Sequence, residues 1–235
     1  LSLRKLSELA GISNPYLSQI ERGLRKPSAE ILQGIAKGLK ISAETLYVRD
    51  EESGTLSGPT LLPVRDGAWP YIARHGQGYT RFEHTAHGIA LDLVQFVPWE
   101  DPVKISRLRI EDRSDRPRRL SVTAYVEWVL GVSRSADAPF IVTERDERTG
   151  ALLARNPWNV DFGDRVAFAD LGGRQTSWTC DRTEMLGRHG APDHPAALAG
   201  GHRWSGRTGT GLDPCAALQA TLELPAGGST EIVFL

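Results

Sequence analysis

The sequence predicts an α + β protein of two parts, a small all-α helix-turn-helix bundle followed by an antiparallel β-sandwich. Two observations predict this division. Apolar residues recur at helical spacing up to about residue 48 and at alternate positions beyond about residue 50. Helix-capping residues punctuate the first stretch, whereas turn clusters divide the second into short segments rich in Val, Ile, Thr and aromatic residues.

The composition is typical of a globular protein in water. The chain has 235 residues, of which 40% are hydrophobic and 24% are charged, and its formal net charge is −1. No apolar run approaches the ~20 residues that span a bilayer, and the first residues lack the apolar stretch of a signal peptide. Cys180 and Cys215 have no metal-binding spacing and are predicted to be buried thiols. We therefore expect no membrane insertion and a reduced, cytoplasmic setting.

Charge is unevenly distributed along the chain. The first fifty residues hold eight Lys or Arg against five Asp or Glu, whereas the remainder is net negative. The sign of this asymmetry favours a nucleic-acid partner at the N-terminal end.

The first stretch is divided into short helices. Gly11 ends one helix, Ser13 stands at the N-cap of the next, and Pro27 precedes a further restart. A last short helix is predicted from Ala43 to about Val48. The apolar positions that define these helices are Leu3, Leu6, Leu9, Ala10, Leu17, Ile20, Ile31, Leu32, Ile35, Ala36 and Leu39.

The second stretch predicts many antiparallel strands, as in a sandwich or an open barrel. Val122, Ala124 and Val126, for example, alternate with polar or aromatic residues. The segment from Gly187 to Gly211 predicts a long loop, of a length that is often functional or mobile. The predicted strands cover residues 79–84, 88–97, 103–110, 120–130, 166–170, 176–180, 216–224 and 230–235.

Residues 2–23, SLRKLSELAGISNPYLSQIERG, fit the requirements of a helix-turn-helix. The motif needs two short helices at a steep angle, so that the second can enter the major groove. Gly11 allows the tight turn, and Ser13 caps the second helix. Leu17 and Ile20 face inward at positions i and i+3, which leaves the intervening polar side chains free to point outward.

This segment resembles the Cro/CI-type (XRE) helix-turn-helix family of bacterial and phage repressors, most specifically in the run Leu17 to Gly23 and the following Arg25, Lys26 and Pro27. The resemblance implies sequence-specific binding of double-stranded DNA, of the transcriptional-regulator type. Many such repressors pair about a two-fold axis, which makes a homodimer one candidate state, although the sequence offers no dimerisation helix. The implied base contacts are Asn14, Tyr16 and Gln19, flanked by Ser13 and Ser18, and the implied phosphate contacts are Arg22, Arg25 and Lys26.

The segment departs from that family at its start. The family has a further helix before residue 2, and the expectation is that the helix-turn-helix domain, residues 1–48, lacks it. The alternative to DNA binding is a small helical bundle that binds nothing.

Residues 49–235 are similar to the cyclic β-1,2-glucan synthases and, more broadly, to the N-terminal supersandwich domain of the family 94 glycoside phosphorylases. The runs ARHGQGYTRFEHTAHGIALDLVQFVP (73–98), DPVKISRLRIEDRSDRPRRLSVTAYVEWVLG (101–131) and APFIVTERDERTGALLARNPWN (138–159) carry this resemblance. In those enzymes a helical barrel after the sandwich holds the catalytic carboxylate and the phosphate site. We expect no such barrel here, hence no enzyme activity, no catalytic residue and no cofactor.

The carboxylates agree with that expectation. Glycosidic cleavage needs two carboxyl groups across a sugar cleft. Glu83, Asp92, Glu127 and Asp170 are scattered along predicted strands, and no pair is expected to meet.

Sugar contact remains an expected role for the sandwich, with a β-glucan or an oligosaccharide as partner. Trp158 lies between Asn156 and Asn159 in a predicted loop, and an aromatic face with amides beside it suits a sugar ring. The alternative is that Trp158 anchors the loop. Trp128 alternates with apolar residues and is predicted to be buried.

No metal site is predicted. His84 and His87 would fall on opposite faces of a strand, and no third ligand is evident.

The two predicted domains abut at about residue 48 without a Gly/Ser/Pro linker. Functional fusions usually join whole domains through a flexible segment. We therefore hold two hypotheses: a DNA-binding regulator with an accessory sandwich, and a non-catalytic glucan-synthase fragment joined to a helical segment by gene fusion or assembly.

Overall fold

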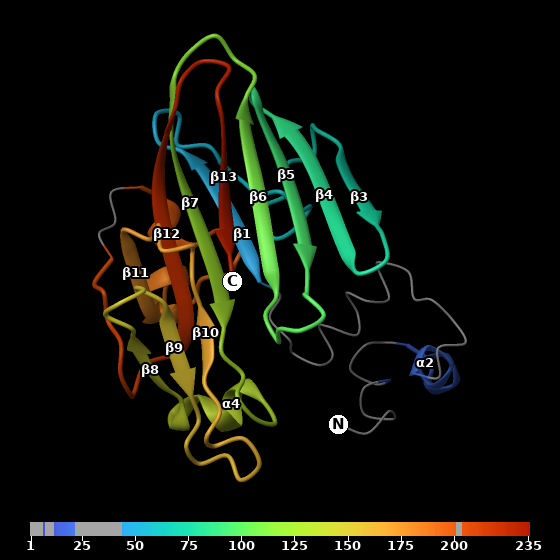
Figure 1. Ribbon diagram of the computed structural model, residues 1–235, viewed down its shortest axis with the longest axis vertical. Helices are drawn as coiled ribbons and strands as arrows, with labels where there is room; N and C mark the ends of the chain where they lie inside the picture. The colour runs from blue at the N-terminus through green and yellow to red at the C-terminus, as the bar shows by residue number, and fades with distance from the viewer. Residues whose placement is uncertain (1–6, 8–11, 22–43, 201–203) are drawn as a thin grey trace.

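The computed structural model describes residues 7, 12–21, 44–200 and 204–235 (Figure 1). All of its sheets are antiparallel. Sheet A has the order β11 (Ser177–Asp181), β12 (Pro214–Leu224), β7 (Arg118–Glu127), β1 (Thr45–Asp50), β2 (Leu56–Ser57). Sheet B has the order β13 (Ser229–Phe234), β6 (Ile105–Asp112), β5 (Ile89–Phe96), β4 (Tyr79–Ala86), β3 (Tyr71–His75). A smaller sheet holds β10 (Ala167–Ala169), β9 (Leu152–Arg155) and β8 (Val142–Arg145).

Short helices occupy a minor part of the described chain. They are α2 (Asn14–Glu21), α4 (Arg134–Asp137), α5 (Arg182–Leu186) and the 3-10 turns η1 (Ala138–Phe140) and η2 (Ala196–Leu198). None of the helices described is long and apolar enough to cross a membrane.

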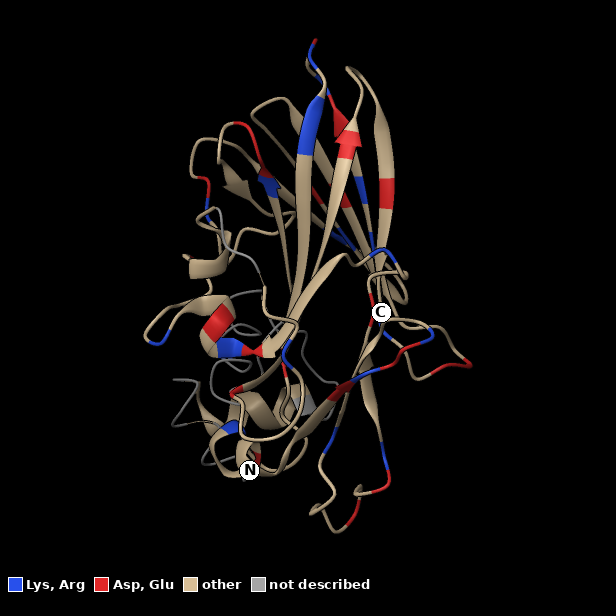
Figure 2. Ribbon diagram, turned by 90° about the vertical axis from the view of Figure 1, so that its left-hand side faces the viewer, with Lys and Arg blue, Asp and Glu red and all other residues tan. Residues whose placement is uncertain are grey.

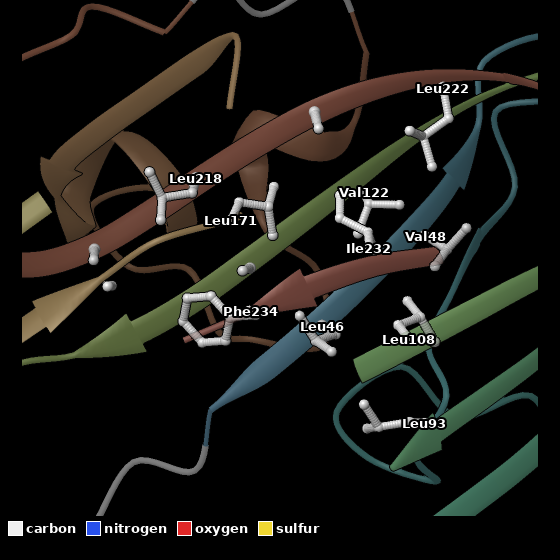
Figure 3. Close-up of a cluster of buried hydrophobic side chains, with 14 of the residues drawn as sticks. Leu46, Val48, Leu93, Leu108, Val122, Leu171, Leu218, Leu222, Ile232 and Phe234 are labelled. Atoms are coloured by element: carbon white, nitrogen blue, oxygen red, sulfur yellow. The ribbon is translucent and has the colours of Figure 1, made fainter. Parts of the chain in front are cut away.

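The main core lies between sheets A and B. Figure 3 shows Leu46, Val48 and Val122 of sheet A close to Leu93 and Leu108 of sheet B. Alternation along β5 and β6 produces this arrangement, since every second residue is buried throughout β6 and from Ile89 to Leu93 in β5. The residues between them are half-buried or exposed and include Asp92, Arg107 and Arg109, so sheet B keeps a charged outer face. Figure 2 marks the charged residues of the chain as red and blue bands on the ribbon.

A second apolar cluster covers the opposite face of sheet A. Tyr47 and Tyr125 pack there against α5, η2 and Trp204. The Tyr47 hydroxyl also donates a hydrogen bond of 2.8 Å to the Pro192 carbonyl. The sequence predicts a long loop of the functional or mobile kind over residues 187–211. In the described part of this segment, η2 and Trp204 pack on sheet A.

The sandwich predicted from the sequence is confirmed, and each of the eight predicted strands overlaps an observed one. The strands that the sequence did not predict are β1, β2, β3, β8 and β9. β2 has two residues, and β3 is an exposed edge strand with no buried face, so neither carries the alternating signal.

The helix predicted over Ala43 to Val48 is wrong for the residues that the structure describes there. Thr45–Asp50 is β1, and all six of its residues pair with β7, from Thr45 opposite Tyr125 to Asp50 opposite Leu120. Both faces of β1 are covered, so its apolar residues do not alternate. A short apolar run without alternation fits a buried strand as well as a helix, and pairing with β7 decides for the strand.

One end of the sandwich is tied together by the buried guanidinium group of Arg118. It donates to Asp50 Oδ2 at 2.6 Å, to the His87 carbonyl at 2.9 Å and to Ser114 Oγ at 3.2 Å. Asp112 Oδ1 lies 3.5 Å from Arg118 Nε. Asp50 and Arg118 belong to sheet A, whereas Asp112 belongs to sheet B and His87 to the β4–β5 turn of that sheet, so these contacts join the two sheets.

The two cysteines are buried and unbonded, as the sequence predicts. Cys180 belongs to the main core and Cys215 to the second cluster, so they lie on opposite faces of sheet A. Burial raises the pKa of the Cys180 thiol to about 11 and raises the pKa of Cys215 well above its usual value. Both thiols are therefore protonated, and inert as nucleophiles, at neutral pH.

Candidate functional site

The predicted recognition helix is present as α2, and the turn before it is braced by hydrogen bonds. The Ser7 hydroxyl donates to the Ile12 carbonyl at 2.5 Å, while the Ile12 N–H donates to the Ser7 carbonyl at 3.2 Å. The Ser13 carbonyl accepts from the N–H groups of Tyr16 and Leu17, each at 3.1 Å. Ser13 therefore occupies the position just before the first turn, as an N-cap does.

α2 has one exposed side and one buried side. Leu17 is buried, whereas Ser13, Asn14, Pro15 and Gln19 are exposed. At about 100° per residue, Asn14, Ser18, Pro15 and Gln19 form one continuous arc opposite Leu17. The half-buried residues are Tyr16, Ser18 and Ile20.

Some of the candidate base-contact residues are thus exposed, and others are half-buried. Asn14 and Gln19 offer their amide groups on the exposed arc, with Ser13 at its start, whereas Ser18 lies within the arc and is half-buried. Tyr16 lies at the margin and is half-buried. The predicted phosphate contacts, Arg22, Arg25 and Lys26, lie outside the described residues.

The predicted sugar-contact residues lie in the loop between β9 and β10. Trp158 is 77% exposed, and its ring centroid lies 5.9 Å from that of Phe140 at an interplanar angle of 45°. Beside this loop is a groove of about 480 Å³, whose walls include Val132, Phe162 and Val166.

The amides on either side of Trp158 form hydrogen bonds within the loop. Asn156 is buried; its Nδ2 donates to the Leu130 carbonyl at 2.8 Å and its Oδ1 accepts from the Trp158 N–H at 3.1 Å. Asn159 Oδ1 accepts from the N–H groups of Asp161 and Phe162. These amides therefore hold the loop backbone, and their contact with sugar stays a prediction.

Three other tryptophans, Trp128, Trp178 and Trp204, are covered by neighbouring side chains. Trp128 is buried in the main core, as predicted. Trp204 is buried in the second cluster. The Arg145 guanidinium carbon lies 4.3 Å from the Trp178 ring centroid, so a cation covers that ring.

Two of the carboxylates predicted to be scattered are neighbours, and that prediction is wrong for them. Glu83 on β4 lies directly opposite Asp92 on β5. The guanidinium of Arg81 donates to Asp92 through Nε at 2.8 Å and Nη2 at 2.7 Å, and its Nη2 lies 3.5 Å from Glu83. Arg74 also pairs with Glu83. The turn at His87 and Gly88, both with positive φ, fixes this register, and a two-residue turn at that point was the missed signal.

This pair has the composition of an ion-pair ladder and not of an acid and a base facing a sugar cleft. The remaining candidates are also bonded within the protein. Glu127 accepts from the Tyr125 hydroxyl at 2.7 Å and from Arg182 Nε at 3.0 Å, and Arg134 Nε lies 2.8 Å from its other oxygen. Asp170 accepts from Gln175 Nε2 at 2.8 Å.

The two histidines considered as metal ligands have other contacts. The His84 ring stacks on Tyr71 at 3.7 Å, and its Nδ1 lies 3.1 Å from the Pro70 carbonyl. His87 Nε2 lies 2.9 Å from Asp66 Oδ2. Within the described part of the chain, no group of three or more His, Cys, Asp or Glu side chains could hold a metal ion.

Comparison with known proteins identifies similarity in both parts of the chain. The family model of the glycosyl hydrolase 94 supersandwich domain matches residues 41–235, and a helix-turn-helix model matches residues 1–46. The two matches overlap where β1 begins.

Three relatives illustrate these matches. The cyclic beta-(1,2)-glucan synthase NdvB of Rhizobium meliloti (strain 1021) is 37% identical over 191 residues, which are 81% of this chain and 7% of that protein. The solabiose phosphorylase of Paenibacillus borealis is 29% identical over 160 residues, 66% of this chain and 21% of that one. An uncharacterized HTH-type transcriptional regulator of Mycobacterium tuberculosis (strain ATCC 25618 / H37Rv) is 58% identical over 66 residues, 28% of this chain and 45% of that one. This chain therefore spans less than half of each relative.

Proposed function

We propose, from the premise that the chain belongs to the glycosyl hydrolase 94 supersandwich family, that it is a non-catalytic sandwich of that family attached to a sequence-specific DNA-binding helix-turn-helix. The family match covers the supersandwich domain, and the candidate carboxylates Asp92, Glu127 and Asp170 are bonded to arginine, tyrosine or amide groups. We place the junction just before Thr45 and not at residue 48, because Thr45 opens a strand of sheet A.

The observation that supports DNA binding is the exposed polar arc of α2. A recognition helix must present hydrogen-bonding side chains over its N-terminal turns, with its apolar side packed away from the groove. Asn14 and Gln19 meet this requirement, while Leu17 is buried opposite them. An Asn or Gln amide can pair with the two hydrogen-bonding groups of adenine in the major groove. Binding to chromosomal DNA would also require the cytoplasmic setting that we propose.

Replacement of Gln19 by Ala is expected to weaken specific DNA binding about tenfold or more, since one bidentate base contact is worth ~1–3 kcal/mol. Specific duplexes would be selected from a random-sequence library with the whole chain and measured by gel shift. Gln77→Ala is the matched control, because Gln77 is an exposed glutamine in the β3–β4 turn.

Binding should also fall steeply between about 50 and 200 mM salt, because phosphate contacts release counterions. If the wild-type chain gives no gel shift at low salt, the DNA-binding proposal is wrong. Equal affinities of Gln19→Ala and wild type for a selected duplex would show that Gln19 is not a base contact.

Contact with a β-glucan is a second candidate function, favoured by the family of the sandwich and by the exposed ring of Trp158. Trp158→Ala is expected to abolish retardation of the chain in affinity electrophoresis through a gel containing cyclic β-1,2-glucan. Trp99→Ala is the control, because Trp99 is a fully exposed tryptophan in the β5–β6 loop. Retardation that is equal for both variants would argue against a sugar contact at Trp158.

A further inference from the structure

The last strand of sheet B has an edge without a neighbour. β3 ends the order of sheet B, and within the described chain no strand pairs with the edge that faces away from β4 (Figure 1). The residues from Ile72 to His75 are exposed. The strand sequence YIARH contains no proline, and its register with β4 has no bulge, two features that commonly prevent further pairing at an edge.

The register identifies the backbone groups that point away from β4. The Gly76 N–H donates to the Tyr79 carbonyl at 3.0 Å, which makes these two residues a hydrogen-bonded pair. Bonded and non-bonded pairs alternate along an antiparallel ladder, so Ala73, opposite Phe82, belongs to a non-bonded pair. The N–H and C=O of Ala73 therefore point outward from the edge, and the same holds for the residues two places before and after it.

An apolar groove adjoins this edge. Its volume is about 620 Å³, and Tyr71 to Ala73 of β3 form one wall, while β1 and the loop between β2 and β3 form others. Leu61 and Leu62 of that loop are 43% and 51% exposed, so the groove is open to solvent. We call it the edge groove. The apolar side chains that line it include Leu46, Leu61, Leu62, Phe82 and Leu93.

The edge and the groove together suit an extended peptide. A strand added to β3 would bond to the outward backbone groups, and every second side chain of that strand would point to the face on which the groove lies. An apolar side chain at such a position would cover Leu61 and Leu62. The backbone groups of β3 distinguish this partner from a small apolar molecule, which would fill the groove alone.

The charges on the other face of β3 define the partner further. The Arg74 side chain is 56% exposed, and Arg74 lies directly opposite Arg81. The same row of the sheet continues with Val94 and Arg107, while Glu83 pairs with Arg74 from the neighbouring row. The row is therefore positive where it reaches the edge. An acidic side chain in the next strand would lie beside Arg74, and opposite charges across strands attract.

We propose that the outer edge of β3 and the edge groove form a docking site for an extended peptide segment of a partner protein, added to sheet B as a further strand. The segment directs an apolar side chain toward the groove and an acidic side chain toward Arg74. The site includes neither α2 nor Trp158, so the proposal is independent of DNA binding and of glucan binding.

The probe is a peptide that is selected with the full chain from a random-sequence library, labelled with a fluorophore and measured by fluorescence anisotropy. Two N-methylated forms, methylated at complementary alternate residues, keep every side chain but lack opposite sets of N–H groups. An added strand bonds to β3 through one set only. One form is therefore expected to bind like the unmodified peptide, and the other about tenfold or more weakly.

Ala73→Pro is expected to weaken binding about tenfold or more, because it removes an outward N–H, whereas the bonds to β4 come from Ile72 and Arg74. Ala73→Ser, the matched control, keeps the N–H and should keep the affinity. Leu61→Asp tests the groove and should also weaken binding, since the peptide would cover a carboxylate without a partner. Val97→Asp is its control, because Val97 is 58% exposed in the β5–β6 loop, outside the groove.

Amide hydrogen exchange in residues 71–75 should slow when the unmodified peptide binds, because bonded N–H groups are protected. Unchanged exchange there, or unchanged affinity in both Ala73→Pro and Leu61→Asp, would place the peptide elsewhere and overturn the proposal. Equal binding of the two N-methylated forms would also overturn it, and would assign the groove to apolar groups without strand addition. Failure to select any peptide that binds saturably would have the same consequence. The N-methylated forms need no substitution in the protein, so the test holds even where Ala73→Pro disturbs the fold.

Discussion

A chain shortened to begin at residue 49 is expected not to fold, whereas a chain that begins at residue 41 is expected to keep a cooperatively folded sandwich. The difference between them contains Thr45 to Val48, which the sequence assigns to the helical part and the structure to β1. Circular dichroism and thermal unfolding of the two shortened chains would measure the outcome.

The physical reason is the position of β1 within sheet A. It lies between β7 and β2, and Leu46, Tyr47 and Val48 are each at most 5% exposed. Burial of one such side chain contributes about 1.5–3 kcal/mol, so removal of three costs ~5 kcal/mol or more. That loss is comparable with the ~5–15 kcal/mol by which a whole domain is stable. β7 would also lose its pairing partner along one edge.

A chain beginning at residue 45 is the matched comparison, since it removes the helical segment and leaves β1 intact. It is expected to unfold cooperatively, like the chain that begins at residue 41. Cooperative unfolding of the chain that begins at residue 49, at a similar temperature, would show that β1 is not a necessary strand and that the junction belongs at residue 48.

Arg118→Ala is expected to cost about 3–5 kcal/mol of unfolding free energy, because the substitution leaves two buried carboxylates without their shared cation. Asp50 and Asp112 are 3% and 2% exposed, and both lie within 3.5 Å of the guanidinium. The His87 carbonyl would lose its donor as well. Arg119→Ala, which removes the exposed neighbour on the same strand, should change stability by less than about 0.5 kcal/mol.

Urea unfolding at neutral pH would measure this difference through the transition midpoint. A midpoint of Arg118→Ala that equals that of Arg119→Ala would mean that the buried ions are satisfied without Arg118. Far-ultraviolet circular dichroism would establish that both variants begin from a folded state.

The ion pairs of Arg118 with Asp50 and Asp112 also predict how the stability of the protein depends on pH. Burial alone would raise the pKa of Asp50, but hydrogen bonds from the Ser53 N–H, from Arg118 and from the Glu52 N–H lower it below its ordinary value. For Asp112, hydrogen bonds from Ser114 and the Gly227 N–H likewise outweigh burial and lower the pKa. A carboxylate with a lowered pKa in the folded state stabilises the protein above its unfolded pKa, about 3.9.

That stabilisation is lost as pH falls through the folded-state pKa values. Wild type should therefore lose stability progressively below about pH 4, and the loss in this range should be smaller for Arg118→Ala. Urea midpoints measured between about pH 2 and pH 7 would give the change of stability with pH for wild type and for Arg118→Ala. A greater loss in Arg118→Ala than in wild type would contradict the assignment of the lowered pKa values to this cluster.

The sequence predicts strands that have one covered face, but it does not predict strands that are covered on both faces or on neither. Half-buried β5 and β6 alternate, and the sequence predicts both. β1 is covered on both faces and β3 on neither, so alternation is lost in each for opposite reasons. Tertiary pairing creates these strands, and composition alone gave no sign of them.

The candidate site shows the same division. The spacing of Leu17 and the polar residues around it was sufficient to predict the two sides of α2, because a helix places residues at a fixed angle. The roles of Asn156 and Asn159 could not be predicted. Their partner, the Leu130 carbonyl, lies 26 and 29 residues away along the chain, and only the folded loop brings it within reach.

The sequence by itself determined the sandwich family, the likeness of the N-terminal segment to helix-turn-helix proteins and the polar side of α2, because each depends on local spacing and on residue type. Only the tertiary structure decided that Thr45 to Val48 form a central strand, that Glu83 faces Asp92, and that apolar residues from two distant segments meet at one end. Each of these depends on contacts between residues far apart in the chain. Local propensity does not encode such contacts, since they arise from packing one sheet on another.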